Sequence, residues 1–141
     1  NGLITQGEGA MGFTIDRVDH IVINCSDLDR TVAWYERVLG LQREEFAYGD
    51  YTHVALKYGR QKFNIRPTGT DHWWSVDNDT PGTLDICLIS TSPIDEVVAH
   101  LGVCGVEIAK GPVSQIGALG PMTSVYFYDP DRNLIEVAVY P

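Results

Sequence analysis

Four polar side chains account for most of the chemistry that this sequence could perform. His20, Asn64, Asp85 and Glu136 each lie in or beside a short apolar run typical of a β-strand. A carboxylate in such a run is costly to bury unless a cation or a hydrogen-bond donor meets it. One imidazole and two carboxylates that converge in a cavity suit a divalent cation with nitrogen and oxygen ligands. The alternative is a metal-free hydrogen-bonded cluster with donors such as Arg66.

Further side chains are candidates for the wall of the same cavity. His53 is a candidate acid or base, and the alternative is a strand histidine that faces solvent. Arg66 is a candidate for binding a substrate carboxylate or phosphate. The aromatic candidates are Trp73, Trp74, Tyr126 and Tyr128. The two tryptophans could instead cap a core or an edge between subunits.

The first half of the chain predicts the elements that position the first set of these residues. A Val- and Ile-rich run at residues 15–25 indicates a strand, and Ser26–Asp29 matches a capping box before a helix that ends at Gly40. Three short strands are then expected at residues 41–47, 51–58 and 61–66.

The second half repeats this order. Residues 84–90 indicate a strand, and Ser92–Asp95 repeats the capping box, with Pro93 expected at the first helical position. The helix is expected to run to about Cys104. The strands that follow are expected at residues 106–113, 122–128 and 134–140, with a Gly-rich mobile cover near the site at residues 114–121.

The two halves align as an internal duplication. When Asp85 is placed on His20, the alignment also places Gly105 on Gly40, without a gap. One extra residue in the turn at 129–133 brings Glu136 opposite Asn64. Strand alternation then puts one polar residue of each key strand on a single face. If the two sheets form one concave surface, the four residues converge.

The duplication divides the chain into four parts and predicts an α+β fold. Residues 15–67 form a first βαβββ module and residues 83–141 a second one, and together they are expected to form an open, barrel-like sheet cavity. Residues 68–82 are a polar connector with an aromatic tip. Residues 1–14 are expected to be a cloning remnant or a flexible arm.

Two motifs carry a resemblance to a known family. The segments VDHIVINCSDLDRTVAWYERVLGL and YFYDPDRNLIEV resemble the glyoxalase/bleomycin-resistance/extradiol-dioxygenase superfamily, known as the vicinal oxygen chelate fold. The resemblance covers about residues 15–140. The segment GPVSQIGALGPMTSVYF resembles small glyoxalase-domain proteins, some of them labelled virulence-associated.

The resemblance implies a divalent metal ion (Zn, Ni, Mn, Fe or Mg) held between the modules. His20 matches the first-strand histidine of the family and Glu136 its final glutamate, which can be both ligand and catalytic group. Asp85 stands where a second histidine or glutamine is usual. Asn64 stands where glyoxalase I has a glutamate, and an amide cannot take a proton from carbon. Ordinary glyoxalase I activity is therefore not expected.

The function implied by the resemblance is a metal-dependent lyase or isomerase for a small substrate with vicinal oxygens. The metal would act as a Lewis acid. A lyase or isomerase is expected over a dioxygenase, whose familiar site has two histidines and one glutamate. The alternative from another class is a metal-free small-molecule binding protein of the antibiotic-sequestering type. A homodimer is also implied by the resemblance.

Composition excludes several partners. The chain has 141 residues and a formal net charge of −9, so it has no basic block to neutralise nucleic acid or an anionic membrane. No run approaches the length of a membrane span. Three cysteines without metal-binding spacing indicate reduced thiols and a cytoplasmic setting, with Cys87 and Cys104 expected to be buried.

Overall fold

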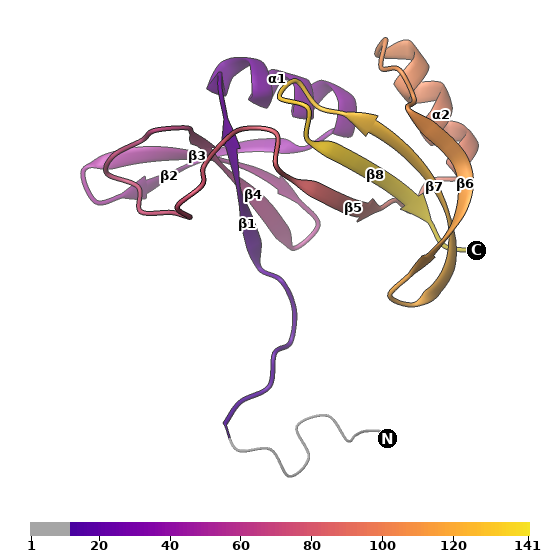
Figure 1. The fold of residues 1–141 in the computed structure, drawn as a ribbon, viewed down its shortest axis with the longest axis horizontal. Coiled ribbons are helices and arrows are strands. Elements are labelled where there is room, and N and C mark those ends of the chain that lie inside the picture. The colour runs from indigo at the N-terminus through magenta and orange to yellow at the C-terminus, as the bar shows by residue number, and fades with distance from the viewer. Residues whose placement is uncertain (1–11) are drawn as a thin grey trace.

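The computed structural model describes residues 12–141 and confirms an α+β fold of two βαβββ modules (Figure 1). The first module consists of β1 (His20–Cys25), α1 (Leu28–Leu39), β2 (Gln42–Tyr48), β3 (Tyr51–Tyr58) and β4 (Gln61–Pro67). The second module consists of β5 (Asp85–Ile89), α2 (Ile94–Val103), β6 (Lys110–Gly117), β7 (Gly120–Tyr128) and β8 (Leu134–Val139).

The two sheets have the same topology. Their strand orders are β1-β4-β3-β2 and β5-β8-β7-β6, with the first pair of each sheet parallel and the rest antiparallel. The residue pairing also corresponds: Asn64 pairs with Val22, and Glu136 with Cys87, its equivalent in the repeat. Each sheet remains separate within the protomer, so the expected single concave surface does not close into a barrel in one chain.

Both helices lie on the same side of the molecule, each against its own sheet (Figure 1). The side chains between helices and sheets form one continuous apolar core. Its largest fully buried members are Tyr35, Phe63, Phe127, Ile23, Leu56, Ile65, Leu101 and Ile135. Alternation along each strand sends these apolar residues toward the helices, and the intervening polar residues face the opposite side of the sheet.

The turn between β7 and β8 joins the modules. Asp129 is buried and accepts a hydrogen bond from the Tyr35 hydroxyl of α1 at 2.6 Å. Its carboxylate also accepts bonds from the backbone and side chain of Asn133. Asp131 accepts a hydrogen bond from the backbone of Ser26, just before α1, at 3.1 Å. This turn in the second module therefore holds the first turn of the first module's helix.

Three local predictions about the two helix starts and the first strand were wrong. The N-cap of α1 is Asp27, whose side chain accepts from the backbone of Arg30, and not Ser26. Pro93 is itself the N-cap of α2 and has no side-chain cap bond. Residues 15–19 precede β1 as coil, because β4 begins only at Gln61 and so offers them no strand partner.

The predicted mobile cover at residues 114–121 belongs to the β6–β7 hairpin. Ser114 pairs with Thr123 and Gly117 with Gly120, so the glycines serve a tight turn between paired strands. The predicted burial of two cysteines was also wrong. Cys87 is exposed, since β5 is an edge strand, and Cys104 is half-buried at the end of α2. All three cysteines carry free thiols.

The predicted arm at residues 1–14 lies mostly outside the described residues. Gly12–Asp19 leads into β1 without regular structure and extends from the body of the molecule (Figure 1). Neither helix in the described part of the chain is long and apolar enough to cross a membrane.

Candidate functional site

The first polar face is formed by β1, β3 and β4. Asn64 lies at its centre, between Val22 and Ala55 on the neighbouring strands, and is 7% exposed. His20 lies at the exposed start of β1, where its Nδ1 is 2.9 Å from Asp19 Oδ2. With Nδ1 donating to the carboxylate, the lone pair of Nε2 is left for another partner. This is the arrangement in which a histidine commonly binds a metal.

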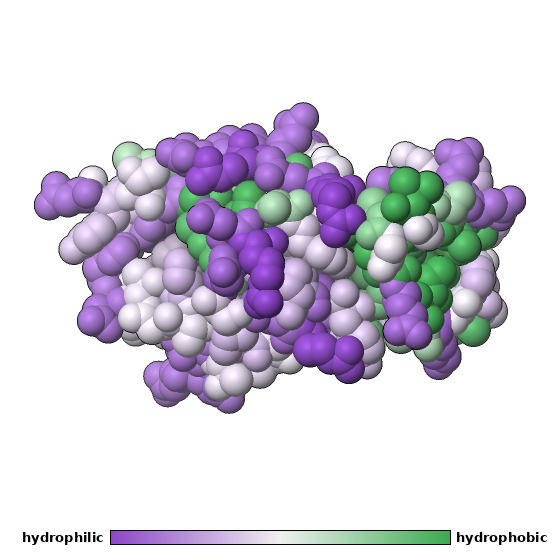
Figure 2. Space-filling view, turned by 90° about the horizontal axis from the view of Figure 1, so that it is seen from above, coloured by the Kyte–Doolittle hydropathy of each residue, from purple (hydrophilic) through white to green (hydrophobic). Residues whose placement is uncertain are grey.

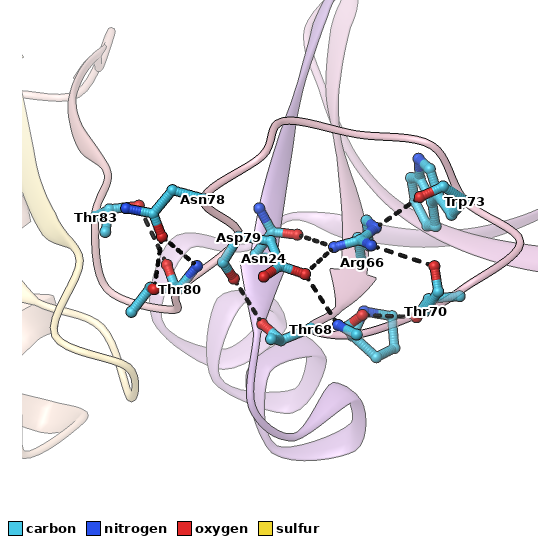
Figure 3. A network of polar contacts seen from close by, with 11 residues as sticks. Asn24, Arg66, Thr68, Thr70, Trp73, Asn78, Asp79, Thr80 and Thr83 are labelled. Carbon is cyan, nitrogen blue, oxygen red and sulfur yellow. Dashed lines mark hydrogen bonds and ion pairs between the residues drawn. The ribbon is translucent and has the colours of Figure 1, made fainter.

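The connector binds the first module through Arg66 (Figure 3). The Arg66 guanidinium is buried and donates to the Asn24 side chain and to Asp79, both at 2.8 Å. It also donates to the backbone carbonyls of Thr70 and Trp73 at 3.2 Å. The hydrogen bond from Arg66 lowers the pKa of Asp79. Arg66 was predicted to bind a substrate anion, and in this structure its donors instead hold the connector.

A cluster of aromatic rings lies where the connector meets β2 and β3. His53 was expected to face solvent more readily than a cavity, but it is only 5% exposed. Trp73 stacks on His53 with centroids 4.0 Å apart, and His72 meets His53 edge to edge. Trp74 is 95% exposed and does not line a cavity in the protomer. The two adjacent tryptophans therefore separate into one ring packed on the sheet and one ring in solvent.

The second polar face lies on β5, β7 and β8. Glu136 is half-buried between Cys87 and Tyr126, its partners on the neighbouring strands. Burial raises the pKa of the Tyr126 hydroxyl, and the Glu136 carboxylate raises it further. Burial and Glu136 likewise raise the pKa of the Cys87 thiol to about 11. Asp85 is exposed at the start of β5, and Tyr128 lies beyond Tyr126 with Arg132 over its ring.

The two faces carry matching unsatisfied oxygens. Asn64 Oδ1 and Glu136 Oε2 are buried without a hydrogen-bond partner, and so is Ser124 Oγ on β7, the strand next to that of Glu136. Asn64 and Glu136 are equivalent in the repeat and in strand register. Buried polar atoms are nearly always satisfied in native proteins, so an acceptor left open at both positions points to a missing donor or cation. These side-chain oxygens suit a cation, because divalent metal ions bind amide and carboxylate oxygens.

The structure does not assemble the full predicted metal site in one protomer. Among residues 12–141, no group of three or more His, Cys, Asp or Glu side chains is placed to hold a metal ion. His20 and Asn64 lie on one sheet, and Asp85 and Glu136 on the other. Each polar face thus carries two of the four predicted ligands.

A groove with a volume of about 1040 Å³ lies between the modules. It is lined by Val18 and Ile21 near the edge of the first sheet, and by Ile86 and Leu88 of β5. Val103 and Ile89 are 87% and 53% exposed. Figure 2 shows hydrophobic residues gathered at the end formed by the second module. This module consequently leaves apolar surface uncovered.

Sequence reasoning missed three residues that shape the site. His72 was not singled out, although it contacts His53. Asp79 was not singled out, although it pairs with Arg66. Asp129 was taken for turn chemistry alone. His72 and Asp79 lie in the connector, where no periodic pattern reports which side chains turn back to the sheet.

The sequence matches the model of the Glyoxalase/Bleomycin resistance protein/Dioxygenase superfamily over residues 17–137, and the chain belongs to this family. It is 39% identical over 126 residues to a virulence protein, STM3117, from Salmonella typhimurium, which covers 89% of this chain and 85% of that protein. It is 36% identical over 127 residues to the glyoxalase domain-containing protein RDO1 of Mycosarcoma maydis, covering 90% of this chain and 70% of that protein.

Solved structures show the same fold. An integron cassette protein, VCH_CASS1, from the mobile metagenome of V. cholerae superposes with a TM-score of 0.87 at 37% identity, covering 93% of this chain and all of that one. More distant likenesses include a lactoylglutathione lyase from Agrobacterium tumefaciens (TM-score 0.66, 21% identity, 89% and 94% covered). TnmS3, an antibiotic-binding protein from Streptomyces, superposes at 0.72 with 19% identity, with 92% and all of the chains covered. At these identities the last two show the fold alone.

Proposed function

We propose that the protein is a metal-dependent lyase or isomerase that acts on a small substrate with vicinal oxygens. One observation carries the proposal: Asn64 Oδ1 and Glu136 Oε2, equivalent in the duplication, are both buried without a donor. The Nδ1 contact of His20 with Asp19 supports it, because it leaves Nε2 for a metal. The ligands would be His20, Asp85 and Glu136, with Asn64 as a further ligand or donor.

The proposed site is shared between two copies of the chain. In one protomer the four residues divide between two separate sheets. A second copy that places its second polar face against the first polar face of its partner would bring the four together. The exposed apolar side chain of Ile89, which alternation places on the second polar face with Asp85 and Cys87, supports such a homodimer. A cytoplasmic setting stays a prediction.

The chemistry of a bound divalent ion would be that of a Lewis acid toward the substrate oxygens. Glu136 is the residue to take a proton from the substrate and return it, because a carboxylate can be both acceptor and donor. The raised pKa of Tyr126 keeps its hydroxyl protonated and able to donate to a substrate oxygen. Asn64 can orient the substrate through its amide but cannot transfer a proton. The predicted acid or base role of His53 is not used, since its Nε2 is engaged with His72.

A metal-free binding protein is the second candidate. The observation that favours it is the absence, among the described residues, of a three-ligand cluster in the single chain. In this case the unpaired oxygens of Asn64 and Glu136 would accept hydrogen bonds from a ligand. The fold likeness to TnmS3, titled an antibiotic-binding protein, is compatible with both candidates.

Metal analysis tests the two candidates. Protein purified without chelator or nickel affinity is loaded in turn with Zn, Ni, Mn, Fe(II) and Mg. The number of bound ions per chain is then measured, and so is the molecular mass of the protein in solution. We expect about one ion per chain in a dimer. Glu136→Gln should lose it, because the change keeps shape and removes charge.

Glu45→Gln, an exposed β2 carboxylate paired with Arg43, is the matched control and should keep the ion. If no ion binds under any loading condition, the enzyme proposal is wrong. Calorimetric binding of a small cationic or aromatic compound to the same metal-free protein would then support the second candidate.

A further inference from the structure

The connector carries a histidine that meets a histidine of the first sheet. The Nε2 atoms of His53 and His72 are 3.0 Å apart. Their ring centroids are 5.2 Å apart, so the two nitrogens lie between the centroids and the rings meet end to end. One ring must donate and the other accept. This contact, together with the bonds of Arg66, holds the connector against β3 and β4.

Aromatic rings fix both imidazoles in place. His72 stacks on Tyr51 at a centroid distance of 3.5 Å. His53 lies between Trp73 of the connector and Tyr48 of β2, at 4.0 and 4.9 Å. Neither ring can turn away from the other without losing these stacks.

The charges around the pair disfavour extra protons. Phe46 and Tyr48 of β2 and Tyr51 of β3 face the pair with aromatic rings. The charged side chains of β4 are cationic: Arg66, and Lys62 over the Phe46 ring. On the connector, Asp79 is already paired with Arg66, and Asp71 precedes His72 in sequence. Among the described residues, no carboxylate is hydrogen-bonded to either imidazole. Burial and the neighbouring His72 lower the pKa of His53.

Protonation breaks this contact in two steps. A first proton can be placed on the free nitrogen of the donor ring, and the N–H···N bond survives. A second proton gives both Nε2 atoms a hydrogen, so two N–H groups and two positive charges face each other. The hydrogen bond is then replaced by repulsion in a partly buried cluster.

We propose that the His53–His72 pair is a proton-sensitive latch that holds the connector closed at neutral pH and releases it on acidification. The connector, through Trp73, covers part of the face that carries Asn64. The latch therefore regulates access to the first half of the site, and only this consequence rests on the proposed function. The bond of Arg66 to Asp79 does not titrate in this range, because the pKa of Asp79 is lowered, so it remains as the anchor about which the connector opens.

Amide hydrogen exchange tests the latch directly. The Trp73 amide donates to the Thr70 carbonyl inside the connector, and the Val125 amide lies in the central strand β7. Protection factors are measured by NMR at pH 7.4 and 5.0 on metal-free protein with chelator, corrected for intrinsic exchange. We expect the protection of Trp73 to fall about tenfold or more at pH 5.0, and that of Val125 to stay unchanged.

His72→Gln is the decisive variant. A glutamine offers both a donor and an acceptor that do not titrate, so it can bond His53 in either protonation state. His72 is exposed, so the fold should be kept, and the pH effect on Trp73 should disappear. His100→Gln, which alters a histidine bonded to Val38 on the helix side, should keep the effect.

Equal protection of Trp73 at both pH values in the unaltered protein overturns the proposal, as does an undiminished drop in His72→Gln. Because neither measurement needs a metal or a substrate, a failed metal analysis leaves this result intact. A failed latch likewise leaves the metal result intact.

Discussion

The first and second modules share one strand register but differ in how well they are covered. Helix α1 buries Thr31, Val32, Tyr35 and Val38, whereas α2 buries only Leu101. The start of α1 is capped by a side chain, and the start of α2 is not. Duplication has therefore preserved backbone pairing while the side chains that stabilise each helix have diverged.

The first module is the better covered one on both of its faces. On the helix side the first module is the better packed one. On the polar side it is covered by the connector, held by Arg66, while the second face leaves Asp85 and Cys87 exposed. The first module is thus covered by its own connector, and no segment among residues 12–141 covers the second polar face in the same way.

Removing the hydrogen bonds of Asp129, which connect the two modules, should have the largest effect on stability. Asp129→Ala leaves the Tyr35 hydroxyl and the Asn133 amide as buried donors without an acceptor, so the free energy of unfolding should fall by about 3 kcal/mol. Tyr35→Phe removes one donor only and should cost about 1 kcal/mol. Urea unfolding followed by circular dichroism measures both. Equal effects of the two changes would show that Asp129 matters only through Tyr35.

A matched pair of helix substitutions sharpens the comparison. Val32 and Val97 are equivalent in the repeat, but Val32 is buried and Val97 only partly so. Val32→Ala should destabilise the protein by about 2 kcal/mol, and Val97→Ala by less than about 1 kcal/mol. Chemical denaturation at low protein concentration measures the difference. A larger loss for Val97→Ala would mean that the surface of α2 is covered in solution.

The pH dependence of stability should be the smallest effect, and it belongs to the first module. The folded protein lowers the pKa of His53, so the unfolded chain binds its proton more readily. The stability that His53 contributes is therefore fully present above its pKa in the unfolded chain, about 6.5. This contribution is lost as the pH falls through the lower pKa of the folded protein. The free energy of unfolding, measured with urea at pH 7.5 and 5.5, gives the slope of stability against pH. His53→Gln should flatten it and His100→Gln should not, and the same slope in both variants would rule His53 out as the source.

The repeat made most of the fold predictable from sequence. Placing Asp85 on His20 and Glu136 on Asn64 already implies the pairing that the two sheets show. Contacts between modules were not predictable, because neither Tyr35 nor Asp129 differs in type from an ordinary core or turn residue. The contacts of the connector were not predictable for a related reason. The contact of His72 with His53 depends on the path of the connector backbone, which hydrophobic periodicity does not predict.

The candidate site was predictable in its residues more than in its assembly. Strand alternation placed Asn64 and Glu136 on polar faces, and both turned out to hold unsatisfied oxygens. The convergence of His20 with Asp85 and Glu136 was conditional on one concave surface formed by both sheets, and the two sheets stay separate in the protomer. How modules pair depends on exposed surface, which strand patterns do not encode.

The bond between Tyr35 and Asp129 has a consequence for synthesis on the ribosome. Its two residues are 94 positions apart, so the first module emerges long before the acceptor for its most buried hydroxyl exists. Domains generally begin to fold from the N-terminus as they are made. The Tyr35 hydroxyl of α1 therefore has no acceptor until the turn between β7 and β8 has been made, so a turn of the second module completes a helix of the first.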